Sequence, residues 1–174
     1  MIPKTKEEAA RTASEKARQY MEKYGSCAQS TLLGLQETFD MKDDNVFKAA
    51  GAMTGGIGGM NDACGSLLGA SLFFGQVTGR SINDYPNKDK LGPSMKLTGQ
   101  LYKWFEKEYG SPTCYDIRTK FGGGVYYEMS IPWQAELAKE ARLHEQCAEM
   151  VGNTAAKAAE MVWDGRGKGE NSKP

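Results

Sequence analysis

The chain has 174 residues, enough for a single domain with a core that needs no disulfide or metal to fold. Lysine plus arginine and aspartate plus glutamate both number 22, so the formal net charge is zero. This balance argues against a nucleic-acid-binding protein and against electrostatic attachment to an anionic membrane, because both require excess positive charge.

The first two elements are predicted helices, each with a recognisable periodicity and cap. One helix runs from about Thr5 to Tyr24, and Gly25 ends it. Its small and apolar stripe consists of Ala9, Ala13, Ala17, Tyr20 and Tyr24. The second helix covers 27–39 after Ser26 as its cap, and its apolar face consists of Leu32, Leu35 and Phe39.

A glycine-rich segment follows in the first half of the chain. Before it, Asp43 or Asp44 is expected to cap a short helix that reaches Ala50. Residues 51–60 then contain too many glycines for a stable helix interior. We therefore predict a loop here that connects two helices.

Helical patterns resume after this loop. Asn61 or Asp62 is expected to cap a helix over about 64–75. The polar residues 79–93, punctuated by glycine and proline, predict a loop. A long helix is then predicted over 95–109, with an apolar face that contains Leu97, Leu101, Trp104 and Phe105.

The last third of the chain contains two further breaks. After Gly110 to Thr113, a helix is expected to begin at Cys114 and to end at the glycines 122–124. Residues 125–131 are the only stretch that resembles an extended strand. From Pro132 a helix is predicted to reach about Trp163, with a break near Gly152.

These patterns together predict an all-α protein, a multi-helix bundle with a glycine-rich connecting loop. Residues 1–163 are interpreted as a single helical domain that contains all four cysteines. Residues 164–174 are rich in glycine, lysine and serine and are expected to be a disordered tail.

The ends and apolar stretches of the chain bear on its cellular compartment. The N-terminus is charged from Lys4 onward and has no apolar core, so no secretory signal is expected. The most apolar stretch, 67–77, is too short and too rich in glycine to span a bilayer. We expect a cytoplasmic protein, in which reduced cysteines bind metal or perform redox chemistry rather than form structural disulfides.

The four cysteines lie far apart in the sequence, so no pair forms the Cys-x-x-Cys knuckle of zinc ribbons or thioredoxin-like proteins. They can still share one site, because the helices of a bundle can each present one ligand to the interior. Each lies on the apolar stripe of its own predicted helix. These residues are Cys27, Cys64, Cys114 and Cys147.

Two local features favour a functional site over a plain core. Cys27, Cys64 and Cys114 each begin a predicted helix, where the partial positive charge and the free N–H groups stabilise a thiolate. The glycine-rich loop leads directly to Cys64, and its flexible backbone lets N–H groups approach a bound group closely. The alternative is that the cysteines are small hydrophobic core residues, as buried reduced cysteines often are.

The same residues resemble a known family, the redox-active proteins named for their C-GCAxxG-C-C cysteine pattern. The resemblance covers about Tyr20 to Val162. It consists of Cys27-Ala-Gln-Ser, the glycine run ending at Met60, Cys64-Gly-Ser-Leu-Leu-Gly69, Phe105 to Cys114, and a late Cys147. Ser66 stands where the pattern usually has alanine, and the segment 121–146 is longer than the pattern leads us to expect.

The resemblance implies a helical domain with four functional cysteines. It extends to the iron–sulfur domain of split-Soret cytochromes, which implies a cluster ligated by these cysteines and a homodimer. The chain has no Cys-x-x-Cys-His sequence, so covalently attached c-type haem is not expected.

We therefore expect an electron-transfer or redox-sensing protein with an unidentified redox partner. Its iron–sulfur cluster, [2Fe–2S] rather than [4Fe–4S], would be held by all four cysteines. Gly58, Gly59 and Gly65 are expected to bring the backbone close to it. A metal-free thiol–disulfide oxidoreductase, with Cys27 and Cys64 as nucleophiles, is the alternative. A structural zinc domain is a third possibility.

Histidine and methionine are two further residue types that can act as ligands. His144, the only histidine, lies one helical turn before Cys147 and could donate or accept a proton there. Its charged neighbours favour an exposed position instead. Four methionines fall on helical stripes and are interpreted as core residues. They are Met21, Met95, Met150 and Met161.

Overall fold

Residues 2–169 are described by the structure, a computed structural model, and residues 166–169 are described by their backbone alone. The helices are α1 (Lys6–Tyr24), α2 (Cys27–Thr38), α3 (Asp44–Gly51), α4 (Gly65–Thr78), η1 (Lys88–Leu91), α5 (Gly92–Tyr109), α6 (Cys114–Phe121), α7 (Pro132–Glu140) and α8 (Leu143–Gly169). The described residues contain no strand, only an isolated bridge between Ala63 and Thr113. The predicted all-α bundle is confirmed.

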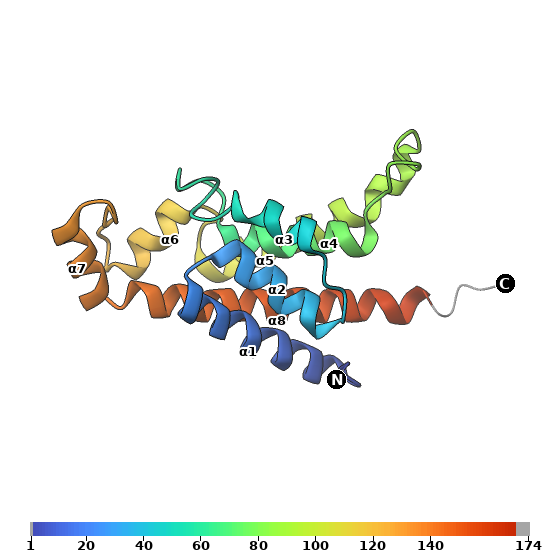
Figure 1. Cartoon of the computed structure of the whole chain (residues 1–174), viewed down its shortest axis with the longest axis horizontal. Helices are drawn as coiled ribbons and strands as arrows, with labels where there is room; N and C mark the ends of the chain where they lie inside the picture. Colours follow the sequence, from blue (N-terminus) through green and yellow to red (C-terminus); the bar gives the residue numbers. More distant parts are fainter. Residues whose placement is uncertain (1, 170–174) are drawn as a thin grey trace.

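The helix α8 forms the long axis of the molecule (Figure 1). Helix α1 packs along it, and α2 packs against both. Helix α4 packs on α2, and α5 lies against α4. Helices α6 and α7 lie at the end of the molecule where α8 begins (Figure 1). This end of the bundle carries the candidate site.

Two predicted caps, Gly25 and Asp43, are present, and Thr5 and Thr113 serve as additional N-caps. Ser26 occupies the N-cap of α2, but its side chain makes no capping hydrogen bond. The Thr5 hydroxyl accepts a hydrogen bond from the Glu8 amide at 3.1 Å, and Gly25 ends α1 in the left-handed conformation with φ of 72°. The Asp43 carboxylate accepts from two amides of α3. Thr113 caps α6 in the same way. These side chains satisfy backbone groups that have no partner within the helix.

The cap of α4 differs from the prediction. Neither Asn61 nor Asp62 caps this helix; Cys64 itself occupies the N-cap position. Asn61 instead adopts the left-handed conformation, with φ of 61°, and its carbonyl accepts from the Tyr115 amide at 3.0 Å. The preceding residues are therefore used for a contact with α6, which lies far along the chain.

The C-terminal half contains three further corrections. Residues 125–131, expected to be extended, form no strand. The predicted helix from Pro132 breaks at Arg142, with φ of 55°, and not at Gly152, which lies inside α8. Helix α8 continues to Gly169, beyond the predicted end near Trp163. The rest of the predicted tail, 170–174, lies outside the described residues.

Small residues bring the helices close together. An ideal Cβ on Gly34 of α2 would lie 2.8 Å from Cβ of Ala17, and one on Gly152 of α8 would lie 3.0 Å from Oγ of Ser14. The alanines at 9, 13 and 17 are fully buried, as the stripe on α1 predicts. Met21 completes this stripe in place of Tyr24, which is 66% exposed.

Aromatic and aliphatic side chains fill the rest of the core. The largest fully buried side chains include Phe73, Phe74, Phe105, Leu32, Leu35 and Leu101. Met95, expected in the core, is 61% exposed instead. Among residues 2–169, no helix combines the length and the hydrophobicity that a membrane crossing requires.

Glu37 on α2 is the centre of a partly buried ion-pair network. Its carboxylate lies 2.7 Å from Nζ of Lys16 and 2.9 Å from Nζ of Lys42, and the Tyr20 hydroxyl donates to it at 2.8 Å. Burial raises the pKa of Glu37, but these three partners outweigh burial and lower it from 4.5 to about 2. A carboxylate with a lowered pKa stabilises the fold above its unfolded pKa.

We expect the Glu37→Gln variant to be about 1–3 kcal/mol less stable at pH 7. The wild-type contribution is lost as pH falls from about 4.5 towards 2, so the two stability curves should converge there. Urea unfolding between pH 2 and 7 measures this. The control is Glu22→Gln, which removes the exposed pair with Arg18 and should change stability little. Parallel curves for Glu37→Gln and wild type would contradict the prediction.

Candidate functional site

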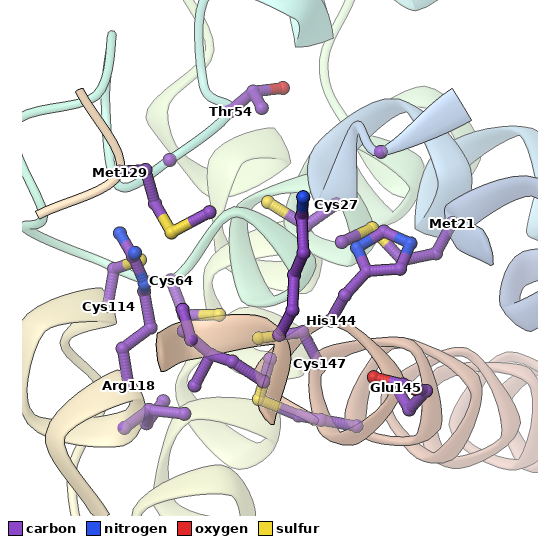
Figure 2. A pocket seen from close by; sticks show the side chains of 17 residues that line it. Met21, Cys27, Thr54, Cys64, Cys114, Arg118, Met129, His144, Glu145 and Cys147 are labelled. Atoms are coloured by element: carbon purple, nitrogen blue, oxygen red, sulfur yellow. The ribbon is translucent and has the colours of Figure 1, made fainter. Parts of the chain in front are cut away.

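All four cysteines line one cavity of about 420 Å³ (Figure 2). None of them forms a disulfide; Cys64 and Cys114 are buried, and Cys27 and Cys147 are partly exposed. They come from four different helices or helix caps and converge at the end of the bundle where α6 and α8 meet. The structure thus brings together the four cysteines that we predicted from the sequence to be functional.

Each cysteine lies at or near the start of a helix. Cys27 and Cys114 are the first residues of α2 and α6, and Cys64 is the N-cap of α4. Cys147 lies within the first two turns of α8, because that helix begins at Leu143. The starts of α2, α4, α6 and α8 therefore lie around the same cavity, where the partial positive charge of a helix N-terminus favours a thiolate.

Backbone hydrogen bonds hold Cys64 beside Cys114. The Cys64 amide donates to the Pro112 carbonyl at 2.8 Å, and the Cys114 amide donates to the Asp62 carbonyl at 2.7 Å. These two bonds flank the bridge between Ala63 and Thr113. Two residues distant in the sequence are thereby fixed by main-chain contacts, which do not depend on a bound group.

Cys27 is held against the start of α4. An ideal Cβ on Gly65 would lie 2.3 Å from Sγ of Cys27, closer than any real Cβ contact. Gly65 therefore leaves the space in which the sulfur lies. The backbone at this glycine approaches the sulfur of Cys27; its approach to a bound cluster stays a prediction.

The glycine-rich loop contributes to the cavity through residues other than those predicted. Thr54 and Gly55 line it. Gly58 and Gly59 are exposed, have open space around them and are not among the lining residues. The loop bends back so that the Asp62 amide donates to the Gly56 carbonyl at 3.1 Å. This bend places Gly58 and Gly59 at the outer tip.

Burial controls the protonation of the thiols. Burial first, and then the nearby Cys27, raise the pKa of Cys64 to about 12. Burial also raises the pKa of Cys147 to about 12, with Cys64 as the next cause. Without a bound cation these two sulfurs are thiols at neutral pH. A metal centre would supply the positive charge that thiolates need here, so its binding should release protons.

Arg118 is a site residue that sequence reasoning missed. It lies one helical turn after Cys114 on α6 and lines the cavity (Figure 2). Burial, followed by Cys27, raises the pKa of Cys114, and the Arg118 guanidinium opposes this rise. The guanidinium also donates to the Tyr127 carbonyl at 2.9 Å and lies 5.1 Å from the Tyr126 ring. Arg118 lies four residues after Cys114 and therefore on the same face of the helix. This spacing could have identified it from the sequence.

Three methionines add further sulfur to the cavity wall. Met21 and Met150 are buried, as predicted, and also line the cavity. Met129 lies in the segment between α6 and α7 and reaches the cavity from the opposite side (Figure 2). From α7, Ala138 and Lys139 complete this cover. Met129 and α7 thus cover the side of the cavity that faces away from the bundle.

His144 lies at the rim rather than among the sulfurs. Its side chain is exposed, and its Nε2 lies 3.3 Å from the carbonyl oxygen of Glu22. It still lines the cavity together with its neighbour Glu145. The expectation of an exposed histidine is confirmed, and the position leaves it within the mouth of the site.

The cavity wall is a soft, sulfur-dominated donor set of the kind that suits zinc, copper(I) and iron–sulfur clusters. A single tetrahedral zinc ion, with bonds of about 2.3 Å, requires sulfurs roughly 3.8 Å apart. Within the described part of the chain, no group of three or more histidine, cysteine or acidic residues is arranged to hold one metal ion.

Comparison with known proteins gives one match. The sequence model of a protein family described as "Putative redox-active protein (C_GCAxxG_C_C)" matches residues 24–161. This range begins just before Cys27 and includes all four cysteines, the glycine-rich loop and α7. No curated protein and no solved structure shows significant similarity to the chain.

Proposed function

Because the chain belongs to this C_GCAxxG_C_C family of redox-active proteins, we propose that its four cysteines hold an iron–sulfur cluster. The ligands are Cys27, Cys64, Cys114 and Cys147. A [2Fe–2S] cluster is preferred to [4Fe–4S]. The protein would act in electron transfer or redox sensing.

The observation that carries this proposal is the convergence of four helix starts on one sulfur-lined cavity. A cluster with four thiolate ligands carries net negative charge. The helix N-termini and Arg118 would offset that charge. α7 and Met129 cover one side of the cavity and would reduce the access of water and oxygen from that side.

Held by these four cysteines, such a cluster would supply one-electron transfer between a reduced donor and an oxidised acceptor. The chain's own residues would hold it, set its potential and control access to it. Around its cover, Met129 is 49% exposed and Trp133 is 64% exposed. Exposed apolar side chains near a redox centre suit a partner surface. An unidentified redox protein or a second copy of this chain are both candidates for that partner.

The absence of a group arranged for one metal ion, within the described residues, keeps one alternative open. In a metal-free oxidoreductase, the Cys27 thiolate would attack a substrate disulfide. Cys64 would then displace the reduced substrate and leave a Cys27–Cys64 disulfide. The raised pKa of Cys64, about 12, makes it a poor thiolate at neutral pH. This reaction is therefore the second candidate.

Anaerobic purification followed by iron, acid-labile sulfide and visible absorption measurements tests the proposal. We expect iron and sulfide in equal amounts and an absorption spectrum that bleaches on reduction. A protein that remains colourless and free of iron after reconstitution would reject the cluster. Reversible loss of two thiols under mild oxidation would then support the oxidoreductase, and one zinc per chain would support a structural zinc site.

A further inference from the structure

Ser66, next to the cysteine cavity, makes two contacts through one hydroxyl. It is fully buried in the first turn of α4. Its Oγ lies 3.4 Å from Sγ of Cys64 and 3.4 Å from Oγ1 of Thr154 on α8. A hydroxyl has one proton, so Ser66 can donate a hydrogen bond to only one of these two atoms at a time.

The Thr154 hydroxyl cannot donate a hydrogen bond to Ser66. It donates to the Met150 carbonyl at 2.8 Å, the usual back-bond of a threonine within a helix. Thr154 is fully buried as well. Towards Ser66 it therefore presents only lone pairs. The Ser66 proton has two competing acceptors at the same distance, a sulfur and an oxygen.

The charge on the sulfur decides this competition. A more negative Cys64 sulfur attracts the hydroxyl proton more strongly, because hydrogen bonds to charged acceptors are about twice as strong as neutral ones. In a dry environment this preference is larger than in water. A centre that gains an electron increases the charge on its ligand sulfurs. The donated proton then stabilises the reduced state.

We propose that Ser66 is a positioning residue that raises the reduction potential of the cysteine-ligated centre, and that Thr154 limits this effect by competing for its proton. The inference rests on the proposed function, because it assigns a tuning role at the same site. It concerns Cys64 alone: the described structure places no comparable hydroxyl contact on the other three sulfurs.

A purely structural role predicts a different pattern. A buried serine is commonly present only to satisfy its own hydrogen bonds, and Thr154 alone would do so. Removal of either hydroxyl would then loosen the same α4–α8 contact. Both changes would shift any property of the centre in the same direction. Opposite shifts distinguish the proposed competition from packing.

The test compares Ser66→Ala, Thr154→Val and the double variant by the reduction potential of the loaded protein. Ser66→Ala should shift the potential to a more negative value, because the donor is lost. Thr154→Val should shift it to a more positive value, because the competing acceptor is lost. The double variant should match Ser66→Ala. Thr38→Val, a buried threonine that donates to the Gly34 carbonyl away from the cavity, is the matched control.

Infrared spectra of the cluster-free full-length chain provide a second measurement. In the cluster-free chain the Cys64 thiol can itself donate to the Ser66 oxygen, the reverse of the bond proposed for the ligated sulfur. Its S–H stretch should therefore move to higher frequency in Ser66→Ala, because the thiol loses that acceptor. The Thr38→Val spectrum should match wild type. A band that does not move in Ser66→Ala would show that the two groups do not interact, even in a chain that binds iron.

Shifts of the same sign for Ser66→Ala and Thr154→Val, or no shift in a fully loaded centre, overturn the inference and leave the proposed cluster intact. A chain that binds no iron overturns the proposed function and this inference with it. Opposite shifts for the two single variants, together with a double variant that matches Ser66→Ala, support both.

Discussion

The Cys64→Ser variant should retain less than about a tenth of the wild-type iron, since loss of a direct ligand costs more than the 10–100-fold in affinity typical of outer-shell changes. Cys64 is the most deeply buried of the four sulfurs, with 3% exposure, and its position is fixed by the hydrogen bond to Pro112. A serine hydroxyl there stays protonated at neutral pH and is a harder and weaker donor than a thiolate. Iron per chain after anaerobic reconstitution measures the effect.

A second cysteine variant extends this prediction to Cys147. Cys147→Ser should lose iron as completely as Cys64→Ser, because Cys147 lies close to the start of α8 and shares the cavity. Circular dichroism is the control, since the helical content should remain unchanged. Full iron retention in Cys64→Ser would exclude a centre shared by all four cysteines.

Much of the fold could be predicted because its helix ends are set by local chemistry. An aspartate at an N-cap and a glycine at a C-cap act through neighbouring residues, so Asp43 and Gly25 were recognisable from the sequence. The small-residue stripe on α1 was equally local. It follows from a helical period that needs no knowledge of the partner helix.

The boundaries that were mispredicted depend on distant contacts. Asn61 and Asp62 are good N-caps by composition, but their carbonyls accept bonds from the start of α6. Arg142 adopts a positive φ, which a non-glycine residue rarely does. No sequence rule marks such a residue as a break. This break moves the start of α8 to within two turns of Cys147, so its place near a helix start could not be foreseen.

The candidate site likewise has features that could be predicted from the sequence and features that depend on distant contacts. The four cysteines were selected by their chemistry and by a family pattern, and both are readable in the sequence. Which glycines approach the cavity depends on how the loop bends. Gly55 therefore lines it, whereas Gly58 and Gly59 do not. The cover formed by α7 and Met129 required the three-dimensional path of the segment after α6.

Gly69→Ala should destabilise the protein through the contact between the two helices that carry Cys27 and Cys64. An ideal Cβ at this position would lie 2.2 Å from the carbonyl oxygen of Ala28 and 3.1 Å from its Cα. These are backbone atoms of α2, so α2 and α4 must move apart. Overpacking of this kind costs about 1–3 kcal/mol, which lowers the melting temperature by roughly 2–12 °C in a protein of this size.

Gly75→Ala in the same helix is the matched control, because nothing lies within 4 Å of its ideal Cβ. Alanine there should raise stability by about 0.5–1 kcal/mol, since glycine loses more conformational freedom on folding. Thermal unfolding of the two variants should therefore give shifts of opposite sign. Iron loading should fall only in Gly69→Ala, because only that change separates Cys27 from Cys64. Equal melting temperatures would show that the α2–α4 contact does not depend on a glycine at position 69.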